Sequence, residues 1–176
     1  MAIIETVSPE SATGEIADIY EQTKQRIGYI PNSHVLYSAN PLVLRQQAEY
    51  IQSIMQHKTL SPALMASIRV LVSQSTQCAY CVDRNTHMLV NYFGWTIDQV
   101  AATKENYMNS PLSDKEKALL GLVIQSVKDS HSVSAKDIES MHGLGWTDGD
   151  IFDAIHHGAR MVAADIVINA FKVEMD

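Results

Sequence analysis

The segment from residue 60 to residue 94, LSPALMASIRVLVSQSTQCAYCVDRNTHMLVNYFG, decides the fold class of this chain. Ser61-Pro62 predicts a helix start, because Ser is a preferred N-cap and Pro at the first helical position has no amide proton to leave unpaired. Apolar residues then recur three and four positions apart, as on one helix face, up to about Ser75. A second helix follows the two cysteines and is expected to stop at Gly94. The segment therefore predicts two consecutive helices with a cysteine pair at their junction.

The rest of the chain carries the same helix signals, and no stretch has the two-residue alternation of a strand. Caps and glycine stops predict six further helices. These signals are a first helix ending at Gly28, a start at Asn40-Pro41, a start at Thr96, a capping box of Ser113 and Glu116, a short helix from Ser134 to Gly143, and a long final helix opening at Thr147. The sequence therefore predicts an all-α protein.

A weak internal repeat relates two parts of the chain, residues 60–100 and residues 112–151. Leu60-Ser61-Pro62 aligns with Leu112-Ser113-Asp114, and Gly94-Trp95-Thr96 aligns with Gly145-Trp146-Thr147. Each copy would be a helical hairpin plus a short helix, and two such units could pack face to face around one core, with the tryptophans inside it. Because no linker divides the chain, residues 1–176 are expected to form a single domain with a weak helical-hairpin repeat.

Composition excludes several classes of partner. The chain has 176 residues, of which 46% are hydrophobic, and a formal net charge of −7. Binding to nucleic acids or anionic membranes is favoured by clustered Lys and Arg. Because this chain is acidic, neither is an expected partner. No apolar run approaches the roughly 20 residues needed to cross a bilayer, and the N-terminus lacks the pattern of a secretory signal. These features predict a cytoplasmic protein that binds small molecules, other proteins or copies of itself.

The two cysteines, Cys78 and Cys81, are the main candidates for chemistry. Residues three apart on a helix have Cβ atoms roughly 5 to 6 Å apart, and modest adjustment would reach the roughly 3.8 Å of a disulfide. The helix N-terminus favours a thiolate and lowers the pKa of Cys78, and Arg84 is the nearest cation in sequence. Three interpretations compete: a redox-active dithiol, a structural metal site, or two inert core thiols.

We favour the redox-active dithiol, and we expect neither a metal nor a cofactor. A structural zinc site needs two more ligands, and the chain has no second cysteine pair to supply them. Asp153 and His157 stand four residues apart on the final helix, near His156 and Asp165, and this spacing can bind a metal. A capped, solvated helix face is the preferred explanation of these residues.

The order of these motifs resembles that of the alkylhydroperoxidase D-like proteins of the carboxymuconolactone decarboxylase superfamily. The motifs are Gly28-Tyr29-Ile30-Pro31-Asn32, Asn40-Pro41, Ser61-Pro62, the Cys-x-Tyr-Cys of residues 78–81, and the final helix with Asn169. The resemblance implies a bundle of antiparallel helices that assembles into trimers or hexamers. It also implies that Cys81 attacks a hydroperoxide, that Cys78 resolves the sulfenic acid, and that a thiol donor re-reduces the pair.

The proton relay of that family is absent. A Glu twelve residues before the first Cys and a His four residues after the second are replaced here by Ala66 and Asn85. His87 lies about 120° around the helix from Cys81, whereas residue 85 lies about 40° away. Because loss of a general base typically costs about 10² to 10⁴ in rate, the departure predicts weak peroxidase activity unless another residue replaces the relay.

The favoured function is therefore a thiol-dependent antioxidant protein or disulfide reductase that cycles the pair against a small hydroperoxide or disulfide substrate. Two alternatives remain open. The first is a non-enzymatic oligomeric redox sensor that keeps the fold without the relay. The second is a decarboxylase like carboxymuconolactone decarboxylase, which needs acid and base groups and no cysteine pair.

Overall fold

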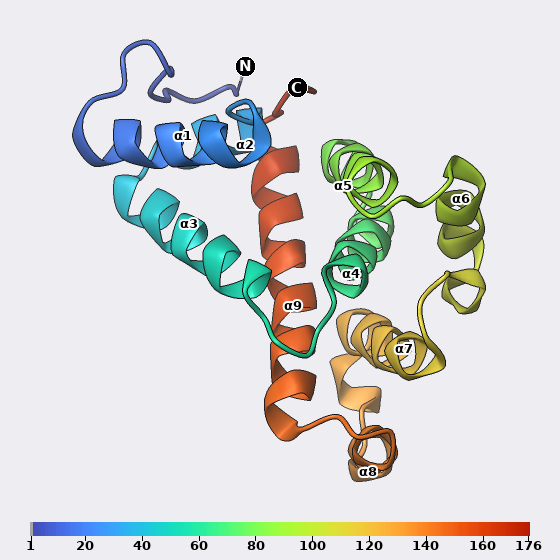
Figure 1. Ribbon diagram of the computed structural model, residues 1–176. Helices are drawn as coiled ribbons and strands as arrows, with labels where there is room; N and C mark the ends of the chain where they lie inside the picture. Colours follow the sequence, from blue (N-terminus) through green and yellow to red (C-terminus); the bar gives the residue numbers. More distant parts are fainter. Residues whose placement is uncertain (1) are drawn as a thin grey trace. The chain divides into compact units, whose positions relative to one another are not determined.

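The computed structural model describes residues 2–176, and within that range every regular element is helical (Figure 1). The all-α prediction is confirmed. The α-helices are α1 (Gly14–Ile27), α2 (Asn32–Tyr37), α3 (Pro41–Met55), α4 (Pro62–Ser75), α5 (Ala79–Asn91), α6 (Ile97–Glu105), α7 (Asp114–Lys128), α8 (Ala135–Gly143) and α9 (Asp148–Ala170). Two 3₁₀ turns, η1 (Tyr107–Asn109) and η2 (Ser130–Ser132), flank α7. Across the described range, no helix is both long enough and apolar enough to cross a membrane.

The chain divides into two compact units. One contains the residues up to His57 together with Val167–Asp176, and the other contains Lys58–Ile166. The helix α9 contributes to the second unit as far as Ile166. Both copies of the predicted repeat and both cysteines lie in the second unit. The single domain expected for residues 1–176 stays a prediction.

The first unit has a small core of its own. Ile19, Tyr20 and Leu44 are buried together, and partly buried apolar residues of α1, α2 and α3 pack around them. The Tyr20 hydroxyl donates a hydrogen bond of 2.8 Å to the carbonyl of Val7, which ties the N-terminal segment to α1. This unit contains no cysteine.

The second unit is built around α4, the helix that precedes the cysteine pair. Eight of its fourteen residues are buried, and α4 packs against both α5 and α7. Such burial on several faces explains why its sequence is almost continuously apolar from Leu64 to Val72, with only Ser67 and Arg69 as exceptions. The turn that carries the cysteines therefore follows a helix that packing holds in place on several faces.

Most of the predicted helix ends are confirmed by their caps. Asn40 and Ser61 accept hydrogen bonds from the third residue beyond them, and Thr96 and Ser113 form capping boxes. Two differences stand out. Helix α2 was not predicted, because its six residues are too few to show a helical period, and α5 ends at Asn91, before the predicted Gly94.

Equivalent caps occur in the two copies of the sequence repeat. Gly94 and Gly145 have φ values of +71° and +79°, a left-handed conformation that favours glycine. Each is followed by a buried tryptophan, with Trp95 and Trp146 only 8% and 4% exposed. Their prediction as core residues is confirmed. The Ser61 hydroxyl donates to the Glu116 carboxylate at 2.5 Å, so a cap of the first copy bonds to a cap of the second.

Helix α9 approaches α7 closely at Gly158, which makes this glycine a test of packing. A Cβ added there would lie 2.6 Å from Cγ1 of Val123 and 3.3 Å from Cγ2 of Val127. Gly158→Ala gains roughly 1 kcal/mol of helix propensity but overpacks a site flanked by stiff β-branched side chains, which costs about 1 to 3 kcal/mol. We expect a net loss of unfolding free energy, measured by urea denaturation. Gly149→Ala on the same helix meets no atom closer than 3.7 Å and should be neutral or slightly stabilising.

Candidate active site at the cysteine pair

The turn between α4 and α5 fixes the position of Cys78. Gln77 has a φ of +58°, a left-handed conformation uncommon for a residue other than glycine. This reverses the chain so that the Cys78 amide donates a 2.9 Å hydrogen bond to the carbonyl of Ser73. Cys78 becomes the N-cap of α5, and Cys81 lies in the first turn of that helix. The pair therefore occupies the helix start that the sequence predicted.

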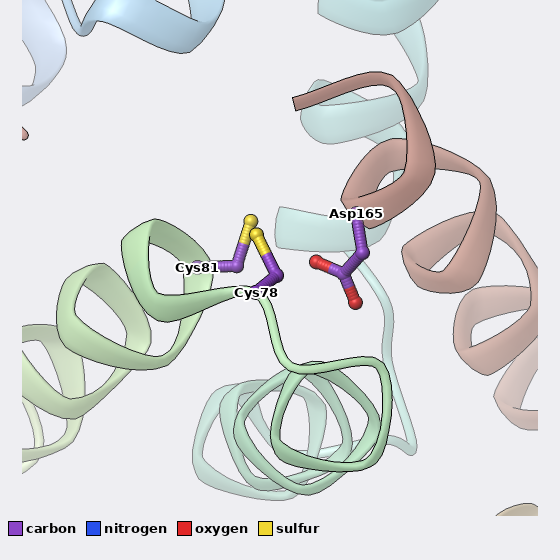
Figure 2. A group of neighbouring side chains, drawn as sticks. All are labelled: Cys78, Cys81 and Asp165. Atoms are coloured by element: carbon purple, nitrogen blue, oxygen red, sulfur yellow. The ribbon is translucent and has the colours of Figure 1, made fainter. Parts of the chain in front are cut away.

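Both cysteines are free thiols buried in the second unit, with Cys78 fully buried and Cys81 3% exposed. Their sulfur atoms and a carboxylate oxygen of Asp165 all lie within 4.8 Å of one another. Figure 2 shows the two sulfurs side by side, with the Asp165 side chain extending from α9 toward them. A two-electron oxidation can convert this pair to a disulfide with only a small movement of the first turn of α5.

Asp165 is the main residue of the site that the sequence did not predict. Its carboxylate is fully buried and accepts hydrogen bonds from the Ser73 hydroxyl at 3.0 Å and the Thr76 hydroxyl at 2.6 Å. Both hydroxyls come from the C-terminal end of α4. The sequence placed Asp165 only among the acidic and histidine residues of the final helix, because nothing local links it to cysteines on another helix.

The three acidic groups shift one another's pKa values. The hydrogen bond between the thiols lowers the pKa of Cys78, and the same bond together with burial raises that of Cys81. Burial raises the pKa of Asp165, partly opposed by the hydrogen bonds that it accepts. Cys78 is therefore the more acidic thiol, in the direction that the helix N-terminus also favours. Arg84 instead donates to the Tyr80 hydroxyl at 3.4 Å.

The positions of the missing relay hold no acid or base. Ala66 is fully buried in α4, and Asn85 donates a 2.8 Å hydrogen bond to the carbonyl of Cys81. His87 is exposed, in agreement with its predicted place on another face of α5. A carboxylate within hydrogen-bond reach of a thiol can accept its proton. Asp165 can therefore act as a proton acceptor, which neither Ala66 nor Asn85 can do.

Arg69 connects Asn85, one of the two relay positions, to His157 on α9. Its Nε donates to Oδ1 of Asn85 at 2.5 Å, and its Nη1 lies 3.1 Å from Nε2 of His157. Because a guanidinium can only donate, Nε2 of His157 must accept, and the imidazole is neutral with its proton on Nδ1. Within residues 2–176, the one group of three or more His, Cys, Asp or Glu side chains close enough to share a cation consists of the two cysteines and Asp165, and Asp153 and His157 belong to no such group.

Neutral His157 predicts a loss of stability in acid. Burial, reinforced by the charge of Arg69, lowers its pKa to about 3. The unfolded chain takes up a proton near pH 6.5, so the stability this residue contributes is present above that pH and is lost as pH falls toward about 3. The loss is on the order of 3 to 5 kcal/mol. Urea unfolding at about pH 7 and about pH 4.5 should show a shallower pH dependence in His157→Gln than in the wild type, and equal slopes would contradict the assignment.

A cavity of about 450 Å³ in the second unit opens between α7, α8 and the two 3₁₀ turns. Its lining includes Tyr107, Gln125 and Lys128 but neither cysteine nor Asp165. A pocket of mixed polarity without a nucleophile offers less chemistry than the buried cysteine pair. We therefore place the candidate active site at Cys78, Cys81 and Asp165.

Comparison with solved structures identifies the fold. No protein-family model matches the chain, and no curated protein is significantly similar in sequence. In three dimensions, the chain matches the alkylhydroperoxidase AhpD core of a peroxidase-related protein from Ralstonia eutropha JMP134 with a TM-score of 0.88. The two are 20% identical, over 99% of this chain and 92% of that chain. The chain has the alkylhydroperoxidase D-like fold. The fold predicted from the order of the sequence motifs is confirmed.

Two further structures share the alkylhydroperoxidase D-like fold. A peroxidase-related protein from Silicibacter sp. TM1040 is 20% identical with a TM-score of 0.82, over 98% of this chain and 88% of that chain. The debrominase Bmp8 is 16% identical with a TM-score of 0.74, over 99% of this chain and 92% of that chain. A cysteine-to-alanine variant of Bmp8 has been solved with 2,3,4-tribromopyrrole. At these identities the likeness establishes the fold and not the reaction.

Proposed function

We propose that this protein is a thiol-dependent oxidoreductase that reduces a small hydroperoxide or disulfide while Cys78 and Cys81 cycle between dithiol and disulfide. The observation that carries the proposal is the grouping of both sulfurs and the Asp165 carboxylate within 4.8 Å of one another. Two adjacent thiols can donate two electrons without a cofactor. A soluble thiol of unknown identity would then restore the pair, and a homo-oligomer, trimer or hexamer, remains the expected assembly.

The reaction balances for a hydroperoxide. One thiolate attacks the terminal peroxide oxygen, the O–O bond breaks, and an alcohol leaves with a proton. The resulting sulfenic acid is then attacked by the second thiol, which forms the disulfide and releases water. Overall, two thiols and one hydroperoxide give one disulfide, one alcohol and one water. Asp165 is the group beside the pair that can hold the proton between these steps.

We assign the attack to Cys81 and the resolving step to Cys78, the roles implied by the family resemblance. Cys81 is the only one of the two with any exposed surface. The hydrogen bond between the thiols favours the charge on Cys78 at rest. Transfer of the shared proton from Cys81 to Cys78 would place the thiolate on the residue that meets the substrate.

The test is a thiol titration of the native protein before and after a brief peroxide pulse, with peroxide consumption followed in the presence of a dithiol reductant. Loss of two thiols per chain with continued consumption supports the peroxidase. Loss of two thiols without peroxide turnover supports a disulfide reductase or the non-enzymatic redox sensor. An unchanged thiol count would contradict all three, because the pair would then be inert.

Reductive dehalogenation is a second candidate, favoured by the match to debrominase Bmp8 over 99% of this chain. In such a reaction one thiolate removes the halogen, the organic fragment takes a proton, and the second thiol displaces halide to form the disulfide. One bromoarene and two thiols thus give one arene, one disulfide and hydrogen bromide. Running the same titration with 2,3,4-tribromopyrrole in place of the peroxide separates the two candidates.

A further inference from the structure

We propose that the reduced protein binds one Zn²⁺ between Cys78, Cys81 and Asp165. The three side chains come from two helices and place two sulfur donors and one oxygen donor within 4.8 Å of one another. From the sequence alone, a zinc site at the pair lacks two ligands, because no second cysteine pair completes it. The structure supplies a different third ligand, the carboxylate of α9, which lies far from the cysteines in sequence.

The donor separations suit zinc. With Zn–S bonds of about 2.3 Å and Zn–O bonds of about 2.0 to 2.2 Å, a tetrahedral site needs donors roughly 3.5 to 3.8 Å apart. Small changes of side-chain angle bring donors within 4.8 Å to that spacing. Two thiolates disfavour Ca²⁺ and Mg²⁺, which take oxygen ligands. Three protein ligands leave the fourth position of a zinc ion for water or an added anion.

The surroundings already orient the carboxylate ligand. Ser73 donates to one oxygen of Asp165 and Thr76 donates to the other, so the side chain is held in place before any ion arrives. Partners of this kind fix the direction of a metal ligand and strengthen binding. A divalent cation would also neutralise two of the three negative charges of the buried ligands. The α4 helix therefore orients the carboxylate ligand, and the ion would offset most of the buried charge.

Zinc and disulfide formation exclude each other, and this consequence rests on the proposed function. A sulfur that is bonded to its neighbour is no longer a thiolate ligand, so oxidation must release the ion. The balanced step takes one zinc-bound dithiolate, one hydroperoxide and two protons to one disulfide, one alcohol, one water and free Zn²⁺. Bound zinc would thus slow oxidation of the pair, and each oxidation of the pair would set one zinc ion free.

The test is a titration of fully reduced, metal-free protein with Zn²⁺ under anaerobic conditions, in competition with a chromogenic chelator. We expect one zinc per chain and protection of both thiols from alkylation. Cys78→Ser, Cys81→Ser and Asp165→Asn should each weaken binding by at least the roughly 10- to 100-fold that loss of an outer-shell partner typically costs, because each removes a direct ligand. Asp150→Asn is the matched control, because Asp150 is a buried aspartate on α9 whose carboxylate also bonds a threonine hydroxyl. It should bind zinc as the wild type does.

Each outcome bears on one proposal. Equal affinity in Asp165→Asn and Asp150→Asn overturns the three-ligand site, and so does zinc that leaves the thiols open to alkylation. Substitution with Co²⁺ provides a second measurement, since sulfur-to-metal absorption should fall in both cysteine variants. Failure to bind zinc in a sample that still forms the disulfide removes this inference and leaves the proposed function intact. Zinc binding by a protein that never forms the disulfide would support the zinc site and contradict the proposed function.

Discussion

Cys81→Ser is expected to reduce dithiol-dependent hydroperoxide turnover by at least about 1000-fold, to the rate without protein. A serine hydroxyl is not ionised near neutral pH and cannot form a disulfide, so both the attack and the storage of two electrons are lost. Turnover is measured as peroxide consumption with an excess of dithiol reductant. The substitution is nearly isosteric, so the fold should survive it, which far-ultraviolet circular dichroism checks.

Cys78→Ser is the informative partner of that variant. With its resolving thiol removed, the protein should react once with peroxide and hold a sulfenic acid on Cys81, detectable by a trapping reagent and peptide mass spectrometry. A sulfenic acid that accumulates on Cys78 in Cys81→Ser instead would reverse the two roles. Full turnover by either single variant would contradict the dithiol mechanism itself.

Asp165→Asn is expected to slow the first turnover by about 10² to 10⁴, the usual effect of removing a positioned acid or base. Asparagine has nearly the same shape, and its single oxygen can still accept from one of the two hydroxyls, Ser73 or Thr76, but it cannot hold the proton. The measurement is a single-turnover reaction of the prereduced protein with peroxide, followed by loss of free thiols. It isolates the chemical step from re-reduction by the thiol donor.

Asp150→Asn again provides the control for that experiment, because it removes a buried α9 carboxylate that has no cysteine beside it. A structural role for Asp165 predicts similar losses of stability in the two variants and similar rates of thiol loss. A role in proton transfer predicts slow thiol loss in Asp165→Asn alone. Unchanged kinetics in Asp165→Asn would leave Cys78 and Cys81 without the proton acceptor proposed here.

The helices could be predicted from sequence because their signals are local. Ser61-Pro62, Thr96 and the box of Ser113 and Glu116 each specify a helix start within four residues, and the structure has a helix at every one of them. The resemblance to the alkylhydroperoxidase D-like proteins rested on the order of several motifs, among them Ser61-Pro62 and the Cys-x-Tyr-Cys of residues 78–81, and the structure has that fold. Short helices such as α2 escape this reasoning because six residues do not complete two turns.

The candidate site was only half predictable for a related reason. Cys78 and Cys81 lie three residues apart, so their proximity follows from helix geometry alone. Asp165 reaches them through the packing of α9 beside the end of α4, which no local pattern encodes. The same holds for Arg69, Asn85 and His157, whose hydrogen bonds join three helices. Only the tertiary structure reveals which of the acidic residues of the final helix belongs to the cysteines.

The complete burial of Cys78 and the near-complete burial of Cys81 make the rate of thiol modification a measure of local opening. A reagent can react only while the first turn of α5 is transiently exposed, so its observed rate is the intrinsic rate multiplied by the fraction of time spent open. Reagents of equal chemistry but increasing size would therefore measure how far the protein opens. Hydrogen peroxide is small and needs only the smallest of these openings. The size of the opening, more than the chemistry of the pair, would then determine which oxidants can reach the cysteines.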